Sequence, residues 1–144
     1  VSAWFHNLRV TPDWTRENFG SMADYLAHYG KTWVREIGLA RDFGGRFPDH
    51  YREVRYEGLV NQPADSLRSI LEFVDVDAGP ETIAHCLAAG DFAGLASGRK
   101  PGHEDRSSHF RKGVVGDWRN HFDDESLARF NSHAAALLRD LGYQ

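Results

Sequence analysis

A short basic segment carries side chains suited to binding an anion. Residues 109–122, HFRKGVVGDWRNHF, hold three permanent cations, two glycines and three aromatics. A guanidinium is a planar fork that fits two phosphate oxygens, and an ammonium adds a movable point charge. Gly113 lets a ligand approach the backbone N–H closely. Arg111, Lys112 and Gly113 therefore predict a local anion site, with Trp118 and Phe122 anchoring it to the core. For a bare Arg-Lys-Gly, a solvated basic loop is the alternative.

The whole chain carries a net negative charge, so any anion site must be confined to a locally basic segment. The 144 residues include 17 Lys or Arg and 21 Asp or Glu, which gives a net charge of −4. A general nucleic-acid binder needs a basic surface, so we expect no nucleic-acid partner. The length and the 41% hydrophobic content fit one core. No apolar run approaches the ~18 residues of a membrane span. The single cysteine, Cys86, excludes an internal disulfide and fits a reducing compartment.

The elements that must position the segment are mostly helical. Apolar spacing and helix signals predict helices over residues 19–40, 63–73, 80–87 and 124–141. Asp91 is predicted to cap a further turn that carries Phe92, and Asp123 or Asp124 to cap the last helix, which Gly142 ends. The glycines and proline of residues 41–50 are expected to break the first helix. Residues 98–108 are expected to form an exposed loop.

One stretch alternates like a strand. In Tyr51–Val60, apolar residues interleave with charges, and we predict a strand there. A single strand makes no sheet, so the chain is either an all-helical domain with an extended segment or part of a larger α/β domain. The start, VSAWFHNL, is apolar, β-friendly and lacks an initiator Met, which favours the second. An incomplete sheet would leave edges through which copies pair.

The basic segment resembles a motif of a known family. RKGVVGDWRNHF is similar over twelve consecutive positions to the C-terminal cofactor motif of the sulfotransferases, Arg-Lys-Gly-x-x-Gly-Asp-Trp-(Lys/Arg)-Asn-x-Phe. The resemblance implies transfer of a sulfuryl group from 3′-phosphoadenosine 5′-phosphosulfate (PAPS) to a hydroxyl or amine of a small-molecule acceptor, leaving 3′,5′-adenosine bisphosphate. It implies a cytoplasmic enzyme with an α/β fold related to P-loop kinases. Residues 1–144 would form the helix-rich C-terminal part of one sulfotransferase domain, with few strands.

Weaker stretches resemble the same family in the same order. VRYEGLVNQPADSLRSILEFV is similar to a strand, turn and helix that would place Tyr56 near the adenine, and GDFAGL to a segment whose phenylalanine, here Phe92, stacks on it. VSAWFH resembles a stretch whose serine, here Ser2, binds the 3′-phosphate. With the strong motif, the implied cofactor-binding residues are Ser2, Tyr56, Phe92, Phe110, Arg111, Lys112 and Gly113.

Departures from the family limit what this segment does alone. GRKPG, residues 98–102, lacks the Ser/Thr and the preceding strand of a phosphosulfate loop. The catalytic base is expected upstream of residue 1, so the chain alone is predicted to be inactive. Asp123 and Asp124 stand where the dimerisation element of many animal members has a Thr-Val pair, which argues against that dimer. The alternatives are a non-catalytic nucleotide- or phosphate-binding module, such as a degenerate relative, and a helical protein–protein module.

Other reactive residues suggest no site. His103 and His109 flank Glu104 and Asp105, but this spacing matches no compact metal pattern, and we expect no metal. Cys86 has no base positioned beside it in the sequence, so we expect it to be structural.

Overall fold

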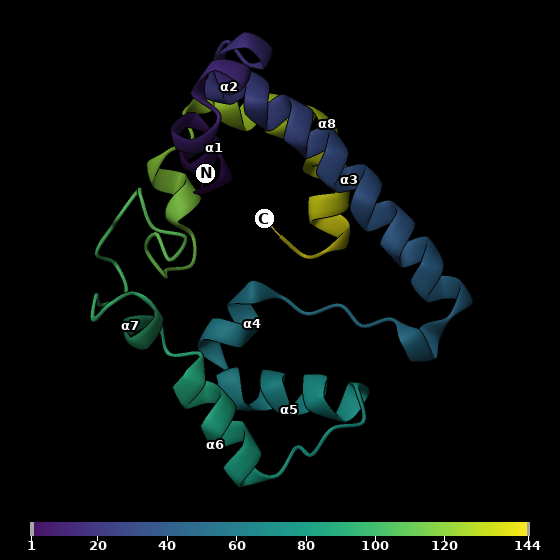
Figure 1. Ribbon diagram of the computed structural model, residues 1–144. Helices are drawn as coiled ribbons and strands as arrows, with labels where there is room; N and C mark the ends of the chain where they lie inside the picture. The colour runs from purple at the N-terminus through teal and green to yellow at the C-terminus, as the bar shows by residue number, and fades with distance from the viewer. Residues whose placement is uncertain (1, 144) are drawn as a thin grey trace. The chain divides into compact units, whose positions relative to one another are not determined.

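The computed structural model describes residues 2–143, with only the backbone of Ser2 described, and its regular structure there is entirely helical (Figure 1). The chain divides into two compact units, residues 1–51 with 117–144 (unit 1) and residues 52–116 (unit 2). Unit 1 contains α1 (Ser2–Val10), α2 (Pro12–Asn18), α3 (Met22–Arg46), α8 (Asp124–Asp140) and the 3-10 turns Pro48–His50 and Asp117–Asn120. Unit 2 contains α4 (Tyr56–Asn61), α5 (Pro63–Phe73), α6 (Pro80–Ala89) and α7 (Phe92–Leu95). Within the described part of the chain, no helix is long and apolar enough to cross a membrane.

Unit 1 is built on the packing of α3 against α8 (Figure 1). The Ser21 hydroxyl caps α3 by accepting a hydrogen bond from the Asp24 N–H at 3.1 Å. An ion pair of 2.5 Å between Arg129 and Asp24 links the two helices. Buried apolar side chains form the core of the unit, namely Phe19 after α2, Ala23, Tyr25 and Leu26 in α3, and Ala134 in α8.

The predicted first helix exists, but its end lies further along the chain. Gly44 and Gly45 do not break α3, which continues to Arg46. Gly44 faces the ring of Tyr51, which would overlap any Cβ at this position. The helix stops where Phe47 precedes Pro48, because the residue before a proline is disfavoured in helical geometry.

The predicted C-terminal helix is confirmed with both of its signals. The Asp123 carboxylate accepts a hydrogen bond from the Ser126 N–H at 2.8 Å, so Asp123 is the cap. Gly142, at φ +72°, takes the left-handed conformation that follows the last turn. The residue that departs from the family's Thr-Val pair thus has a structural use in this chain.

Unit 2 follows the sequence pattern closely in its helices. α5 spans the predicted residues 63–73, α6 runs from Pro80 two residues beyond the predicted end, and Asp91 caps α7 by accepting from the Gly94 N–H at 3.0 Å. Burial is weaker than the amphipathic pattern suggests, since α4 and α5 contain no buried residue. Ile83 of α6 and Ala96 after α7 are the buried apolar residues of this unit.

The predicted strand is wrong. Residues 52–55 carry no regular structure, and α4 begins at Tyr56, with Arg55 as its extended cap residue. A strand needs a partner for its backbone N–H and C=O groups, and none of residues 2–143 forms a strand that could supply one. The β-friendly start is likewise helical, as α1. The expected sheet edge is therefore missing from the described residues, and the predicted α/β class rests on the family resemblance alone.

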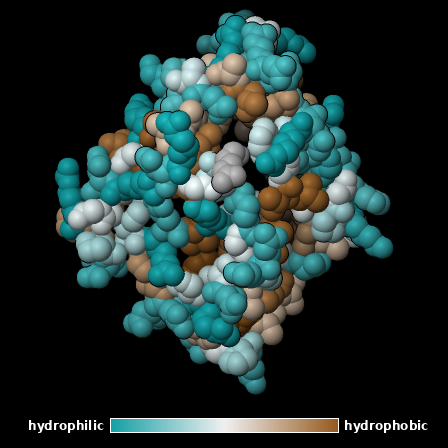
Figure 2. Space-filling model, turned by 180° about the vertical axis from the view of Figure 1, so that it is seen from behind, coloured by the Kyte–Doolittle hydropathy of each residue, from teal (hydrophilic) through white to brown (hydrophobic). Residues whose placement is uncertain are grey.

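Large apolar side chains remain exposed in both units. The face drawn in Figure 2 is mostly hydrophilic, with hydrophobic side chains reaching the surface at several places. Leu39 at the C-terminal half of α3 is 59% exposed, and Tyr56 and Val60 of α4 are 52% and 44% exposed. Single exposed apolar side chains of this kind are normal on the surface of a folded protein.

Candidate functional site

The basic motif is divided by the boundary between the two units. Phe110 to Gly113 belong to unit 2, and Asp117 to Phe122 belong to unit 1. Gly116, at φ +77°, is the last residue of unit 2 and supplies a conformation that other residues rarely adopt. The cationic half and the aromatic half of the motif are therefore positioned by different elements.

In unit 2 the ring of Phe92 lies against Gly113. Gly113 has φ +65°, and a Cβ built on it would overlap the Phe92 side chain. The glycine is thus required twice, once for its left-handed backbone and once for the close approach of the ring. Two residues that the resemblance assigns to the nucleotide, twenty-one positions apart in the sequence, are brought into contact.

The loop of residues 98–108 folds back on the cationic residues. The Gly102 N–H donates to the Lys112 carbonyl and the Asp105 N–H donates to the Arg111 carbonyl, each at 2.8 Å. Most of the loop is exposed, as predicted, but these bonds give its backbone a fixed partner. The loop therefore supports the RKG segment rather than projecting freely into solvent.

Arg99 is the residue of this site that the sequence reasoning missed. Its Nη1 donates to the His103 carbonyl at 2.9 Å and to the Arg111 carbonyl at 3.1 Å, and its Nη2 donates to the Phe110 carbonyl at 2.6 Å. Its Cζ lies 5.8 Å from the centroid of the Phe92 ring. The signal in the sequence is limited to an arginine directly after Ser97 and Gly98, and nothing in that string indicates binding to backbone carbonyls.

Arg111 is buried and paired with a carboxylate. It is 7% exposed, and its Nη1 donates to Oε1 of Glu104. Arg106 also pairs with Glu104, at 3.3 Å. Desolvation acts to raise the pKa of Glu104, but the hydrogen bond from Arg111 and the charges of Arg106 and Arg111 outweigh it, so this pKa lies below its ordinary value. Glu104 is an anion held between two guanidinium groups.

The remaining assigned residues are spread over the chain. Phe110 is 41% exposed, and Lys112 is half-buried beside Arg111. Tyr56 begins α4 and is 52% exposed. Ser2 begins α1, and its side chain lies outside the described residues.

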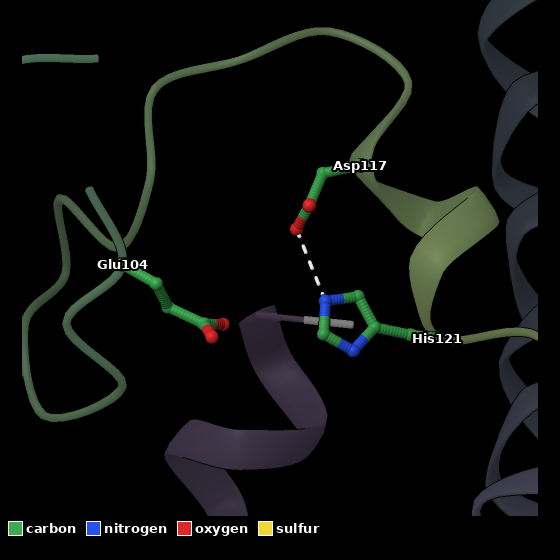
Figure 3. Close-up of side chains that lie close together, drawn as sticks. All are labelled: Glu104, Asp117 and His121. Carbon is green, nitrogen blue, oxygen red and sulfur yellow. Dashed lines mark hydrogen bonds and ion pairs between the residues drawn. The ribbon is translucent and has the colours of Figure 1, made fainter. Parts of the chain in front are cut away.

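In unit 1, the other half of the motif forms a small polar cluster (Figure 3). Asp117 is buried, and its carboxylate accepts a hydrogen bond of 3.0 Å from Asn120 and lies 3.1 Å from Nε2 of His121. The ring of His121 packs edge-on against Phe5 of α1, with 5.5 Å between centroids. Asp117 thus links the first and last residues of the 3-10 turn and fixes the ring of His121.

The predicted aromatic anchor exists in unit 1. Trp118 packs edge-on against Phe122 at 5.5 Å between centroids, and Phe122 packs against Phe130 of α8 at 6.2 Å. Arg119 stacks over the Trp118 ring at 4.5 Å. This anchor fixes the DWRNHF half, residues 117–122, to unit 1, while the cations of unit 2 are fixed by Phe92, Arg99 and the loop.

The acidic residues between His103 and His109 are engaged with other groups of unit 2. Hydrogen bonds from the side chain and then the backbone of Ser107 hold the pKa of Asp105 below its ordinary value, with a smaller contribution from the charge of Arg99. Glu104 is engaged by Arg106 and Arg111. Both carboxylates therefore serve the internal structure of the loop.

Comparison with known proteins gives a consistent family assignment. A sulfotransferase domain model matches residues 5–142. Cytosolic sulfotransferase 1 of Arabidopsis thaliana is 26% identical over 141 residues, which cover 87% of this chain and 42% of the relative. Cytosolic sulfotransferase 4 of the same plant is 28% identical, covering 89% and 45%. Sulfotransferase 2B1 of Mus musculus is 26% identical, covering 85% and 37%.

These relatives are much longer than the chain. The match covers less than half of each of the three relatives named above. No solved structure matches the chain.

Proposed function

Because the chain belongs to the sulfotransferase family through residues 5–142, we propose that it forms the adenosine 3′-phosphate-binding part of a PAPS-dependent sulfotransferase. PAPS supplies the sulfuryl group, which the whole enzyme transfers to a hydroxyl or amine of a small acceptor. In this proposal residues 1–144 are the C-terminal part of one domain, whose full form is an α/β fold related to P-loop kinases. The names of the plant relatives support a cytoplasmic location.

The observation that carries the proposal is the contact of Phe92 with Gly113 beside the buried Arg111. An aromatic face suits an adenine, and a guanidinium with neighbouring backbone N–H groups suits a phosphate dianion. A Cβ at position 113 would close the approach that Gly113 leaves to the ring. The residue types therefore fit the nucleotide, with Phe92 at the base and Arg111, Lys112 and Gly113 at the 3′-phosphate. Ser2, Tyr56 and Phe110 complete the proposed set.

Binding of two nucleotides tests this function. We expect the 144-residue chain to bind 3′,5′-adenosine bisphosphate more tightly than 5′-AMP in isothermal titration calorimetry, because only the first carries the 3′-phosphate. Arg111→Lys should reduce this preference roughly tenfold, since a point charge replaces a bidentate fork. Arg68→Lys, on the exposed face of α5, is the matched control. Equal affinity of the unmodified chain for both nucleotides would refute the assignment.

A second candidate is a nucleotide-binding module without catalysis. In this candidate the RKG segment binds a nucleotide or phosphate without group transfer, and GRKPG lacks the Ser/Thr of a phosphosulfate loop. Under both candidates we expect the chain alone to show no turnover of PAPS with a simple phenol. The upstream coding sequence separates them, because the enzyme requires a lysine-bearing phosphosulfate loop there and the module does not.

A further inference from the structure

Arg99 is directed at the RKG segment by a tight turn at the end of α7. Ser97 and Gly98 both have left-handed backbones, at φ +56° and +84°. The Gly98 N–H donates to the Ala93 carbonyl at 2.7 Å, and the Arg99 N–H donates to the Ala96 carbonyl at 3.2 Å. Non-glycine residues rarely adopt a positive φ, so the geometry at Ser97 is maintained by its surroundings. The turn reverses the chain after α7, the helix that carries Phe92.

The guanidinium of Arg99 fixes consecutive peptide groups of the segment. It donates to the carbonyls of Phe110 and Arg111, while the Gly102 N–H donates to the carbonyl of Lys112. A peptide group is planar and trans, so holding a carbonyl also holds the N–H of the next residue, which points the opposite way. The N–H groups of Arg111, Lys112 and Gly113 are therefore oriented away from the side on which Arg99 and Gly102 bind.

The charge of Arg99 is used inside unit 2. Besides three carbonyl oxygens, it faces the carboxylate of Asp105 at 3.9 Å, and its side chain is 24% exposed. Its guanidinium also lies within cation–π range of Phe92, at 5.8 Å. One side chain thus contacts the proposed adenine-stacking ring and the backbone of the proposed phosphate-binding residues.

We propose that Arg99 is a positioning residue that couples the adenine-binding ring of Phe92 to the phosphate-binding backbone of residues 111–113. It acts through these groups, without itself binding the nucleotide. This inference rests on the proposed function. Its consequence is that base and 3′-phosphate are recognised at a fixed separation, so specificity for the bisphosphate depends on Arg99 as well as on Arg111.

The test compares Arg99→Lys and Arg99→Ala with the unmodified chain and with Arg68→Lys. The dissociation constants of 3′,5′-adenosine bisphosphate and 5′-AMP are measured by calorimetry. A lysine ammonium lacks the planar set of donors with which the guanidinium binds three carbonyls. Arg99→Lys should therefore lower the bisphosphate-to-AMP preference by roughly tenfold. A reversibly unfolded fraction would weaken the apparent affinity for both nucleotides by the same factor, and an irreversibly misfolded one would lower the stoichiometry. Either would leave the ratio of the two constants unchanged, which separates positioning from loss of fold.

A double-substitution cycle then separates positioning from direct contact. Because Arg99 holds the backbone from which the Arg111 side chain projects, Arg99→Lys and Arg111→Lys together should lower the preference by less than the product of their separate effects. Additive effects would assign Arg99 to the phosphate directly and overturn the inference. A preference that survives Arg99→Lys also overturns it while leaving the proposed function intact. Absence of any preference in the unmodified chain removes the proposed function, and this inference with it.

Discussion

The carboxylate of Glu104 is bonded to the guanidinium of Arg111, the cation that we propose binds the nucleotide 3′-phosphate. The carboxylate and the phosphate are both anions, so in this proposal they compete for the same donor. Glu104→Gln should therefore strengthen binding of 3′,5′-adenosine bisphosphate by roughly tenfold, because the amide still accepts a hydrogen bond but repels no phosphate. Calorimetric titration at constant ionic strength measures the change.

The control for charge is Glu81→Gln in the first turn of α6, which removes one negative charge from unit 2 at an exposed position. It should shift the affinity far less than Glu104→Gln does. Weaker binding by the Glu104 variant would mean that Glu104 holds Arg111 ready for the phosphate instead of competing with it.

Gly113 offers a second test, because the cost of its positive φ can be measured separately from the cost of overlap with the Phe92 ring. Gly113→Ala places a methyl group into the ring at φ +65° and should lower the melting temperature by several degrees. Gly102→Ala, at φ +94° with open space around it, carries the backbone strain alone. Thermal unfolding followed by circular dichroism should therefore show a larger loss at position 113 than at position 102.

Removing the ring completes the comparison. In a Phe92→Ala background the Gly113→Ala substitution should cost no more than Gly102→Ala, because the overlap is gone. An undiminished cost in that background would show that the ring contact does not constrain Gly113.

The helices α3, α5, α6, α7 and α8 were predictable because their signals are local, whereas α1, α2 and α4 were not predicted. Pro63, Asp91, Asp123 and Gly142 each act within one turn of their own position, and each stands where the sequence analysis placed it. The failure at Tyr51–Val60 has the opposite cause. Alternating side chains describe a strand only if another strand accepts its hydrogen bonds, and that condition is set elsewhere in the domain.

The residue types of the site were predictable from the sequence, but the contacts between its side chains were not. Arg111 and Gly113 follow from the motif, but the pairing of Arg111 with Glu104 depends on how residues 98–108 fold back. Arg99 gave little signal because its role is to bind backbone carbonyls, which leave no side-chain pattern in the sequence. The division of the motif between two units was equally hidden, because it depends on contacts far along the chain.

Alkaline pH should destabilise unit 1 through Tyr25. Burial, followed by the neighbouring Tyr29, raises the pKa of Tyr25 from 10.0 to about 12, and Asn7 donates a hydrogen bond to its hydroxyl at 3.2 Å. A raised pKa means that the fold favours the neutral phenol. The contribution is therefore complete below pH 10 and is lost as the pH rises towards 12. The loss should reach up to about 2 kcal/mol of unfolding free energy.

Urea unfolding at pH 8, 10 and 11 measures this loss, with Tyr25→Phe as the reference. The variant should be less stable at pH 8, since Asn7 loses its hydrogen-bond partner. Its free energy of unfolding should, however, fall less between pH 8 and pH 11 than that of the unmodified chain. Parallel pH profiles for the two proteins would assign the alkaline loss to other groups.

The packing of α3 on α8 can be tested with two glycines of the same helix. Gly38 has no atom within 4 Å of a Cβ added to it, whereas a Cβ at Gly30 would lie 3.0 Å from the Phe130 ring of α8. Gly38→Ala should therefore stabilise the protein by up to about 1 kcal/mol through helix propensity alone. Gly30→Ala gains the same propensity but must push Phe130 away from α3, so it should be the less stable of the two by at least about 1 kcal/mol.

Urea unfolding of the two variants, read at the helical circular dichroism signal, gives this difference directly. Shortening the facing residue in Phe130→Leu should narrow the gap between the two alanine variants, because the ring edge that meets the new methyl is removed. The Phe130 substitution also removes the ring contacts with Trp33 and Phe122. The two double variants, each with one alanine and Phe130→Leu, are therefore compared with the Phe130→Leu single variant. Equal stability of Gly30→Ala and Gly38→Ala in the original background would show that α3 and α8 do not meet closely at Gly30.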